Sequence, residues 1–231
     1  MTARSVDFRP RARIDHAALR HNLTRVRSAA PGRRIWAVVK ANAYGHGLTE
    51  VGMGLAPVAD GLAVARIDEA LALRRAGLSG PILVLEGPHD LAELEQASRR
   101  GLEIVVHQPF QAELLDAAKL PRPLPVWLKV DTGMHRLGLA PAAAADLGAR
   151  LRDCRNCLGA PRWLTHLANG DDLKDPYTQR QVAQMQRFAG SDALLSIANS
   201  AGILGWPESH GDWVRPGIML YGVSPFVGEL G

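Results

Sequence analysis

The stretch Ile35–Gly47 reads IWAVVKANAYGHG and predicts a buried strand that ends on a lysine. Its apolar run has the length of a strand, and the small residues and glycines behind it favour a turn. Lys40 can keep its stem among apolar neighbours while its amine reaches a cleft, where partial desolvation lowers the pKa of an ammonium group. Gly45 and Gly47 are expected to let the backbone approach a ligand closely. This stretch alone fits a reactive lysine and an ordinary surface lysine equally well.

Further apolar runs recur along the chain and predict seven more strands. With the first, they lie at residues 35–40, 61–65, 81–85, 102–107, 126–130, 162–166, 194–198 and 214–221. Amphipathic segments predict helices at residues 16–29, 67–76, 91–100, 112–120, 141–152 and 177–189. This alternation is typical of a parallel (β/α)8 barrel, a TIM-type α/β fold. A doubly wound open sheet is the alternative, because periodicity does not distinguish a closed sheet from an open one.

Polar residues at the predicted strand ends favour the barrel. Five of them lie at or just beyond the end of a predicted strand: Lys40, Lys129, His166, Asn199 and Ser200. Parallel barrels build their sites from loops at the carboxyl ends of the strands. We therefore expect these side chains to meet at one mouth.

Composition limits the class of protein. Of the 231 residues, 47% are hydrophobic and 22% charged, which is ordinary for a globular chain with a sizeable core. No linker divides it, so we expect one domain over residues 1–231, with a short strand or helix before the barrel. No apolar run reaches the roughly 18 residues that cross a bilayer, and no secretory signal is evident. We expect a cytoplasmic protein that does not contact a membrane.

Charge and cysteine usage exclude two further classes. The net charge is +4, but the arginines are scattered rather than gathered in one tract, so we do not expect a nucleic-acid partner. Cys154 and Cys157 have a C-x-x-C spacing without a second pair, so we expect reduced thiols and no metal site. Glu69 and Asp68 are interpreted as helix caps or solvated charges.

Residues 38–47, VVKANAYGHG, resemble the cofactor-lysine motif of bacterial alanine racemases, which use pyridoxal 5′-phosphate (PLP). In that family the lysine at the position of Lys40 holds PLP through a Schiff base, and the tyrosine at the position of Tyr44 binds its phosphate. A desolvated amine suits Lys40 both as a nucleophile and as a base. The resemblance extends over about residues 10–225.

Residues 129–138, KVDTGMHRLG, resemble the family's K-x-D-T-G-M-x-R-L-G segment at every fixed position. The resemblance implies that Arg136 faces the phenolic oxygen of the cofactor and the substrate carboxylate, since a planar guanidinium pairs carboxylates at two points. In many members the lysine at the position of Lys129 is carbamylated by CO2 and positions this arginine. The sequence leaves open whether Lys129 is modified here.

Three further matches lie near the ends of the later predicted strands. His166 matches the family's histidine beside the pyridine ring, and residues 199–201 match its N-S-A segment. Residues 214–222, VRPGIMLYG, resemble V-R-P-G-I-x-L-Y-G, in which the arginine bonds the pyridine nitrogen. The resemblance implies cofactor contacts from Lys40, Tyr44, His166, Asn199, Ser200, Arg215, Gly217, Ile218 and Tyr221. It implies catalytic roles for Lys40, Arg136, His166 and Arg215.

The chemistry at the ring nitrogen distinguishes this pattern from that of many PLP enzymes, which place a carboxylate there. Because a guanidinium keeps its proton, a ring nitrogen that faces Arg215 stays an unprotonated acceptor. This arrangement disfavours extensive charge delocalisation into the ring and suits proton exchange at the substrate Cα. The resemblance thus implies an alanine racemase that interconverts L-alanine and D-alanine and supplies D-alanine for peptidoglycan.

Racemisation needs a base on each face of the substrate carbanion. Lys40 is one; in the family the other is a tyrosine from a β-rich C-terminal domain of the partner subunit in a homodimer. The 231 residues match only the barrel half, so we expect a truncated chain that binds PLP but racemises alanine poorly alone. Two alternatives stay open. One is a barrel-only PLP-binding protein of cofactor homeostasis, and the other is a basic barrel that binds phosphorylated ligands or nucleic acid without a covalent cofactor.

Overall fold

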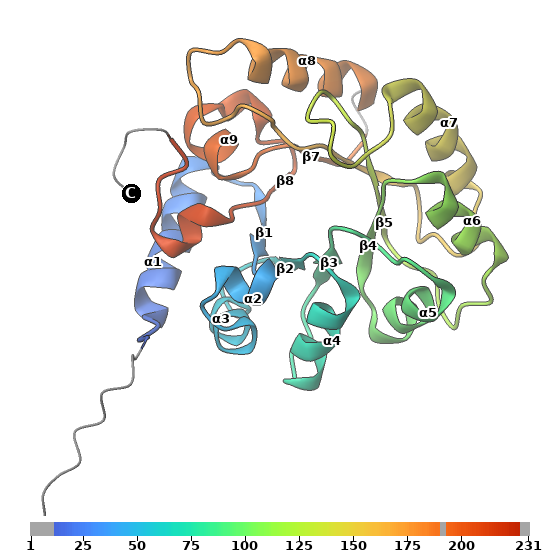
Figure 1. The fold of residues 1–231 in the computed structure, drawn as a ribbon, viewed down its shortest axis with the longest axis horizontal. Helices are drawn as coiled ribbons and strands as arrows, with labels where there is room; N and C mark the ends of the chain where they lie inside the picture. The colour runs from blue at the N-terminus through green and yellow to red at the C-terminus, as the bar shows by residue number, and fades with distance from the viewer. Residues whose placement is uncertain (1–11, 190–192, 227–231) are drawn as a thin grey trace, which may run out of the picture.

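The computed structural model describes residues 12–189 and 193–226, which form one parallel sheet of eight strands (Figure 1). The strands are β1 Arg34–Val38, β2 Gly61–Val64, β3 Ile82–Val84, β4 Glu103–Val106, β5 Val126–Lys129, β6 Arg162–Leu164, β7 Leu195–Ser196 and β8 Trp213–Val214. They pair in the order β7-β6-β5-β4-β3-β2-β1-β8. The Asp212 amide donates to the Leu195 carbonyl and the Arg215 amide to that of Ala198, both at 2.9 Å. These bonds join the segments of β7 and β8, so the sheet is a nearly closed barrel, as predicted.

Helices surround the barrel on its outside (Figure 1). They are α1 His16–Ala29, α2 Lys40–Tyr44, α3 Leu48–Leu55, α4 Ile67–Arg75, α5 Leu91–Arg100, α6 Pro109–Ala117, α7 Pro141–Arg152, α8 Tyr177–Ala189 and α9 Ser200–Gly205, with 3-10 turns η1 Pro207–Ser209 and η2 Ile218–Tyr221. Asp15 caps α1, because its Oδ1 accepts from the amides of Ala17 at 2.8 Å and Ala18 at 3.1 Å. In the part of the chain that the structure describes, no helix is long and apolar enough to cross a membrane.

Several predicted boundaries differ from the structure. The last strand ends at Val214 rather than at residue 221, because Pro216 lacks a donor for the ladder and the chain then turns into η2. Helix α6 begins at Pro109, earlier than predicted, since proline suits the first turn of a helix. Lys40 lies two residues beyond β1 rather than at its end. Helix α1 precedes the first strand of the barrel, and residues 1–11 lie outside the described residues.

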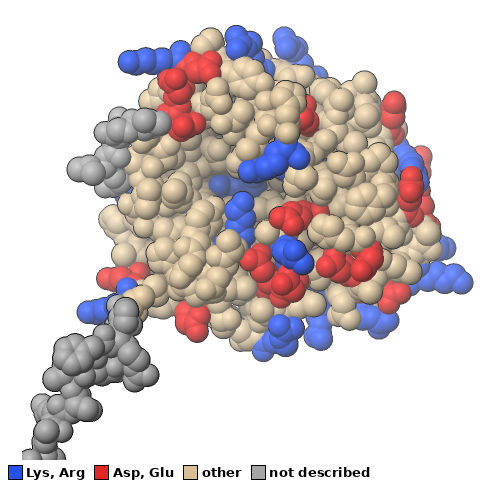
Figure 2. Space-filling view, in the orientation of Figure 1, with Lys and Arg blue, Asp and Glu red and all other residues tan. Residues whose placement is uncertain are grey.

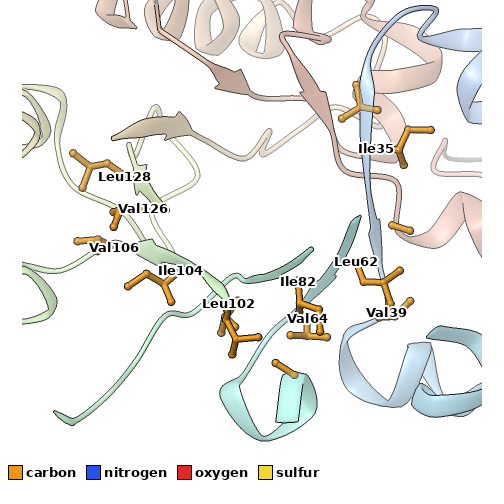
Figure 3. Close-up of a cluster of buried hydrophobic side chains, with 14 of the residues drawn as sticks. Ile35, Val39, Leu62, Val64, Ile82, Leu102, Ile104, Val106, Val126 and Leu128 are labelled. Atoms are coloured by element: carbon orange, nitrogen blue, oxygen red, sulfur yellow. The ribbon is translucent and has the colours of Figure 1, made fainter. Parts of the chain in front are cut away.

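Alternation along the strands decides which side chains face the helices. Apolar residues on the outer side of β1 to β5 are fully or nearly fully buried against the helix layer (Figure 3). The residues between them form a separate cluster inside the barrel: Trp36, Val38, Ala63, Leu83, Val105, Trp127, Leu164 and Trp213. Burial on both faces is why these strands read as continuous apolar runs.

The same alternation places the polar residues of the mouth. Lys129 follows the inward Trp127 by two positions, as Arg215 follows Trp213. Side chains two residues apart share a face and are separated by roughly 6.6 Å along the strand. These cations therefore stand one layer above the apolar interior, on the side of the carboxyl ends.

Three tryptophans fill the inside of the barrel below that layer. The rings of Trp36 and Trp213 stack with centroids 4.2 Å apart, and Trp127 meets Trp36 edge-on at 6.4 Å. Gly61 is paired with Trp36 in the sheet, and a Cβ at Gly61 would lie 2.2 Å from the indole ring. A side chain larger than hydrogen therefore does not fit beside Trp36 without a shift of the ring.

Candidate active site

A cavity of about 650 Å³ opens at the carboxyl ends of the strands. Figure 2 shows lysine and arginine side chains inside this hollow of the molecule. Ten predicted site residues line it: Lys40, Tyr44, Lys129, Arg136, His166, Asn199, Ser200, Arg215, Gly217 and Ile218. The remaining one, Tyr221, lies behind Tyr44. The volume is in the range of small-molecule sites, roughly 300–1,000 Å³.

Lys40 enters the cavity from an unusual piece of backbone. The four residues after it, Ala41 to Tyr44, have φ values of 53° to 54°, so α2 is a single turn of left-handed helix. A non-glycine residue in this conformation costs roughly 1–2 kcal/mol. Gly45 and Gly47 continue with φ of 87° and 97°. Neither of them lines the cavity, so in this structure they continue the turn, and their close approach to a ligand stays a prediction.

Aromatic packing supports this turn. The Tyr44 ring lies 4.8 Å from that of Tyr221, and the Tyr221 hydroxyl donates to the Val38 carbonyl at 3.1 Å. Burial raises the pKa of the Tyr44 hydroxyl, and burial together with the neighbouring Tyr44 raises that of Tyr221. Both hydroxyls therefore keep their protons at neutral pH. Tyr44 can donate a hydrogen bond into the cavity, while Tyr221 fixes its ring from behind.

Ser200 and Gly217 meet Tyr44 across the cavity wall. The Ser200 Oγ accepts from the amides of Gly217 at 3.0 Å and Met219 at 3.3 Å. A Cβ at Gly217 would lie 2.4 Å from the Tyr44 hydroxyl, so only glycine allows this contact without displacement. Asn199 caps α9 by accepting from the Gly202 amide at 3.0 Å. Two hydroxyls thus gather beside glycine backbone, an arrangement that can surround a phosphate.

Arg215 is buried among acceptors at the barrel mouth, directly after β8. Its Nη1 donates to the Ser196 Oγ at 2.5 Å, and its Nη2 donates to the carbonyls of Thr165 at 2.5 Å and Ile197 at 3.2 Å. The same Nη2 lies 3.5 Å from His166 Nδ1. Burial lowers the pKa of Arg215 to about 9, so the guanidinium stays charged at pH 7. Among the hydrogen bonds of the described residues, none uses its Nε.

The cations of the cavity shift each other's protonation. Burial, with help from Arg215 and Arg136, lowers the pKa of Lys129 to about 7. Burial and then Arg136 lower the pKa of Lys40, and burial and then Arg215 lower that of His166. Part of the Lys129 population is therefore uncharged at neutral pH, and an uncharged amine is the form that attacks carbonyl carbon. The positive surroundings favour an anionic ligand.

The Arg136 loop is shaped by Asp131. The Asp131 Oδ1 accepts from the amides of Gly133 at 2.9 Å and His135 at 3.1 Å, and its Oδ2 lies 3.0 Å from His135 Nδ1. Burial raises the pKa of Asp131, but these hydrogen bonds from Gly133 and His135 outweigh it, so the pKa of this carboxyl is lowered. Arg136 itself is exposed at the cavity rim, where it can reach a ligand.

The sequence interpretation missed the contacts that two residues make with the loops of the site. Gln181 in α8 donates from Nε2 to the His166 carbonyl at 3.1 Å, and its Oε1 accepts from the Ala168 amide at 2.9 Å. Glu69, expected to be a cap or a solvated charge, caps α4 and also accepts from the amide of Ala41 at 2.7 Å. The first-turn position of Glu69 predicts the cap, but no local signal indicates either long-range contact.

Comparisons by family model, by sequence and by structure find similarity to the same group of proteins. The alanine racemase N-terminal domain family matches residues 14–225. The alanine racemase of Nitrosococcus oceani is 48% identical over 222 residues, which is 96% of this chain and 62% of that protein. That of Halorhodospira halophila is 50% identical over 221 residues, covering 94% and 60%. The crystal structure of biosynthetic alanine racemase from Pseudomonas aeruginosa superposes with a TM-score of 0.90 at 42% identity, covering 94% and 61%. The chain thus spans about 60% of the length of these relatives.

Proposed function

The chain belongs to the alanine racemase N-terminal domain family, and from this we propose that it is the PLP-binding barrel of an enzyme that interconverts L-alanine and D-alanine. The observation that carries the proposal is one basic cavity into which Lys40, Tyr44 and Arg215 converge from separate segments. A cavity for phosphorylated ligands in general would not need an amine of lowered pKa at this position.

The donors of the cavity fit pyridoxal phosphate. Lys40 offers an amine whose pKa is lowered by burial, and Tyr44 and Ser200 offer hydroxyls for a phosphate beside the glycine backbone at Gly217. Arg215 offers a charged donor held rigid by its other hydrogen bonds. When bound, PLP supplies an aldehyde for an amine and a ring that withdraws electrons from an attached amino acid.

Each of these side chains would then have a different role in the reaction. Lys40 holds the cofactor and, as a free amine, moves the α-proton of alanine on one face. Arg215 would donate a hydrogen bond to the ring nitrogen and keep its own proton, and an unprotonated ring withdraws electrons less strongly than a protonated one. His166 stays neutral beside Arg215, because its pKa lies well below the ordinary value.

Arg136 is proposed to bind the substrate carboxylate from the rim of the cavity. Lys129 lies in the same cavity with a pKa of about 7. Its uncharged amine can add to CO2 with loss of a proton, and the carbamate would change this position from cation to anion. We propose that this anion orients the Arg136 guanidinium by a charge-assisted pair.

The base for the second face of the substrate is proposed to come from outside the described residues, in a homodimer. A positioned general base contributes roughly 10²–10⁴ in rate. The 231-residue chain assayed alone is therefore expected to exchange the α-proton on the Lys40 face and to invert alanine slowly.

The proposal is tested by incorporation of deuterium into alanine. The chain is saturated with PLP in D2O and given L-alanine, and deuterium at Cα is followed by NMR. Exchange is expected with the unmodified chain and with Lys119→Ala, an exposed control, and is expected to vanish with Lys40→Ala. Binding of PLP without exchange would favour a cofactor-homeostasis protein, and absence of binding would refute the proposal.

A further inference from the structure

The loops at the mouth of the barrel are clamped to one another by helix side chains. Gln111 in the first turn of α6 shows the pattern clearly. Its Oε1 accepts from the amides of its own loop, His107 at 2.8 Å and Gln108 at 3.2 Å. Its Nε2 donates to carbonyls of the preceding loop, Glu86 at 2.9 Å and Pro88 at 3.1 Å. One side chain thereby joins two neighbouring loops.

Glu69 occupies the corresponding position in α4. Its Oε2 accepts from the amides of its own loop, Ala65 at 2.8 Å and Arg66 at 3.2 Å. Its Oε1 reaches across to the loop after β1 and accepts from the Ala41 amide at 2.7 Å. The loop that faces Glu69 presents an N–H donor, whereas the loop that faces Gln111 presents carbonyl acceptors. A carboxylate suits the position of Glu69 because it only accepts hydrogen bonds, and an amide suits the position of Gln111 because it both accepts and donates.

The amide of Ala41 is the first after Lys40 and opens the left-handed turn. Each of the four non-glycine residues in that turn is unfavourable in isolation, so further contacts must hold the turn. One such contact is within the loop, where the Leu48 amide donates to the Asn42 Oδ1 at 2.8 Å. Glu69 supplies the contact nearest to Lys40, and a hydrogen bond to a carboxylate is about twice as strong as a neutral one.

We propose that Glu69 is a positioning residue: by holding the Ala41 amide it keeps the left-handed turn in place and fixes where the Lys40 amine enters the cavity. The inference deepens the proposed function and rests on it for the reactive role of Lys40. The geometry of the clamp itself does not depend on a bound cofactor.

The negative charge of Glu69 also acts on Lys40, in addition to its hydrogen bond to the Ala41 amide. Four charged side chains act on Lys40: Arg136 and Arg215 lower the pKa of its ammonium, while Glu86 and Glu69 raise it against the dominant effect of burial. Loss of the Glu69 charge should therefore lower that pKa further. A residue that served only to cap α4 would leave hydrogen exchange at the Ala41 amide unchanged.

The test uses the cofactor-free 231-residue chain and three variants. Glu69→Gln removes the charge and leaves one oxygen to serve amides on two loops. Glu69→Asp keeps the charge but is one methylene too short to reach both loops. Glu50→Gln is the control, because Glu50 lies in the first turn of the adjacent helix α3 and is exposed. Hydrogen exchange at Ala41 and the pH profile of Lys40 acetylation, read by mass spectrometry, are measured for each.

We expect exchange at Ala41 to be about tenfold faster in both Glu69 variants, the change that corresponds to about 1.4 kcal/mol. The acetylation midpoint of Lys40 should move to lower pH in Glu69→Gln and stay closer to that of the unmodified chain in Glu69→Asp. Glu50→Gln should change neither quantity. If Glu69→Gln fails to fold, Glu69→Asp still tests the clamp through exchange.

Exchange at Ala41 as slow in the Glu69 variants as in Glu50→Gln would overturn the proposal. An unchanged Lys40 profile in Glu69→Gln would also overturn it, because loss of the charge is expected to lower the pKa of Lys40. Since no cofactor is present, failure of the chain to bind PLP would refute the proposed function and leave this result intact.

Discussion

Replacement of Lys129 by methionine is expected to remove a pH-dependent cost from the folded barrel. Lys129 is 8% exposed at the end of β5, and its pKa falls from 10.5 to about 7. Between these two pH values the unfolded chain binds more protons than the folded one, so folding stability rises with pH. Each pH unit contributes at most about 1.4 kcal/mol, and the whole shift corresponds to on the order of 5 kcal/mol. Methionine keeps the buried aliphatic stem and carries no proton.

The measurement is the free energy of unfolding in urea, compared between the unmodified chain and Lys129→Met from about pH 7.5 to 8.5. The unmodified chain should gain about 1 kcal/mol relative to the variant over this unit of pH. Buffers are kept free of CO2, because carbamylation would change the charge. Lys119→Met is the control at an exposed lysine.

Groups whose pKa does not depend on Lys129 cancel in the comparison, because both proteins contain them. Lys129 does lower the pKa of His166 and of His107, but burial is the larger cause and lowers both below the ordinary value, so these side chains stay neutral above pH 7.5. Burial raises the pKa of Cys157 and of the tyrosines at the mouth, which affects both chains equally. Parallel stability curves for Lys129→Met and the unmodified chain would show that Lys129 is not desolvated in the folded state. That result would refute the electrostatic account of the cavity.

Two substitutions at glycine test the packing around the site. Gly217→Ala places a Cβ 2.4 Å from the Tyr44 hydroxyl, so PLP affinity in a titration should fall roughly 10- to 100-fold, whereas Gly80→Ala, in open space, should leave it unchanged. Equal affinity in both would mean that Tyr44 does not bind the cofactor. Gly61→Ala places a Cβ 2.2 Å from the Trp36 ring and should cost about 1–3 kcal/mol in urea unfolding. No loss would show that the ring moves aside freely.

The barrel was predictable because its strands are buried on both faces. Continuous apolar runs such as the one before Lys40 locate the strands, and the helical periodicity of residues 177–189 gives α8 within its observed bounds. The predicted bounds of the last strand were wrong, because the apolar residues of this run continue past Pro216 into a 3-10 turn. Hydrophobicity alone does not report where a ladder loses its donors.

For the cavity, the sequence predicted which residues line it but not how they are held. Family resemblance selected residues that the fold brings to one cavity, but it did not reveal how Lys40 is held. The left-handed turn contradicts the local preference of Ala41 and its neighbours, so no propensity indicates it. The contacts of Glu69 and Gln181 join segments 28 and 15 residues apart and depend on the closed barrel.

The most direct test of the account is the location of the covalent adduct. The chain is incubated with PLP, reduced with borohydride, digested and mapped by mass spectrometry. There are four candidate lysines, Lys40, Lys119, Lys129 and Lys174. The account predicts a pyridoxyl group on Lys40. Modification of another lysine in its place, or of none in cofactor-saturated protein, would contradict it.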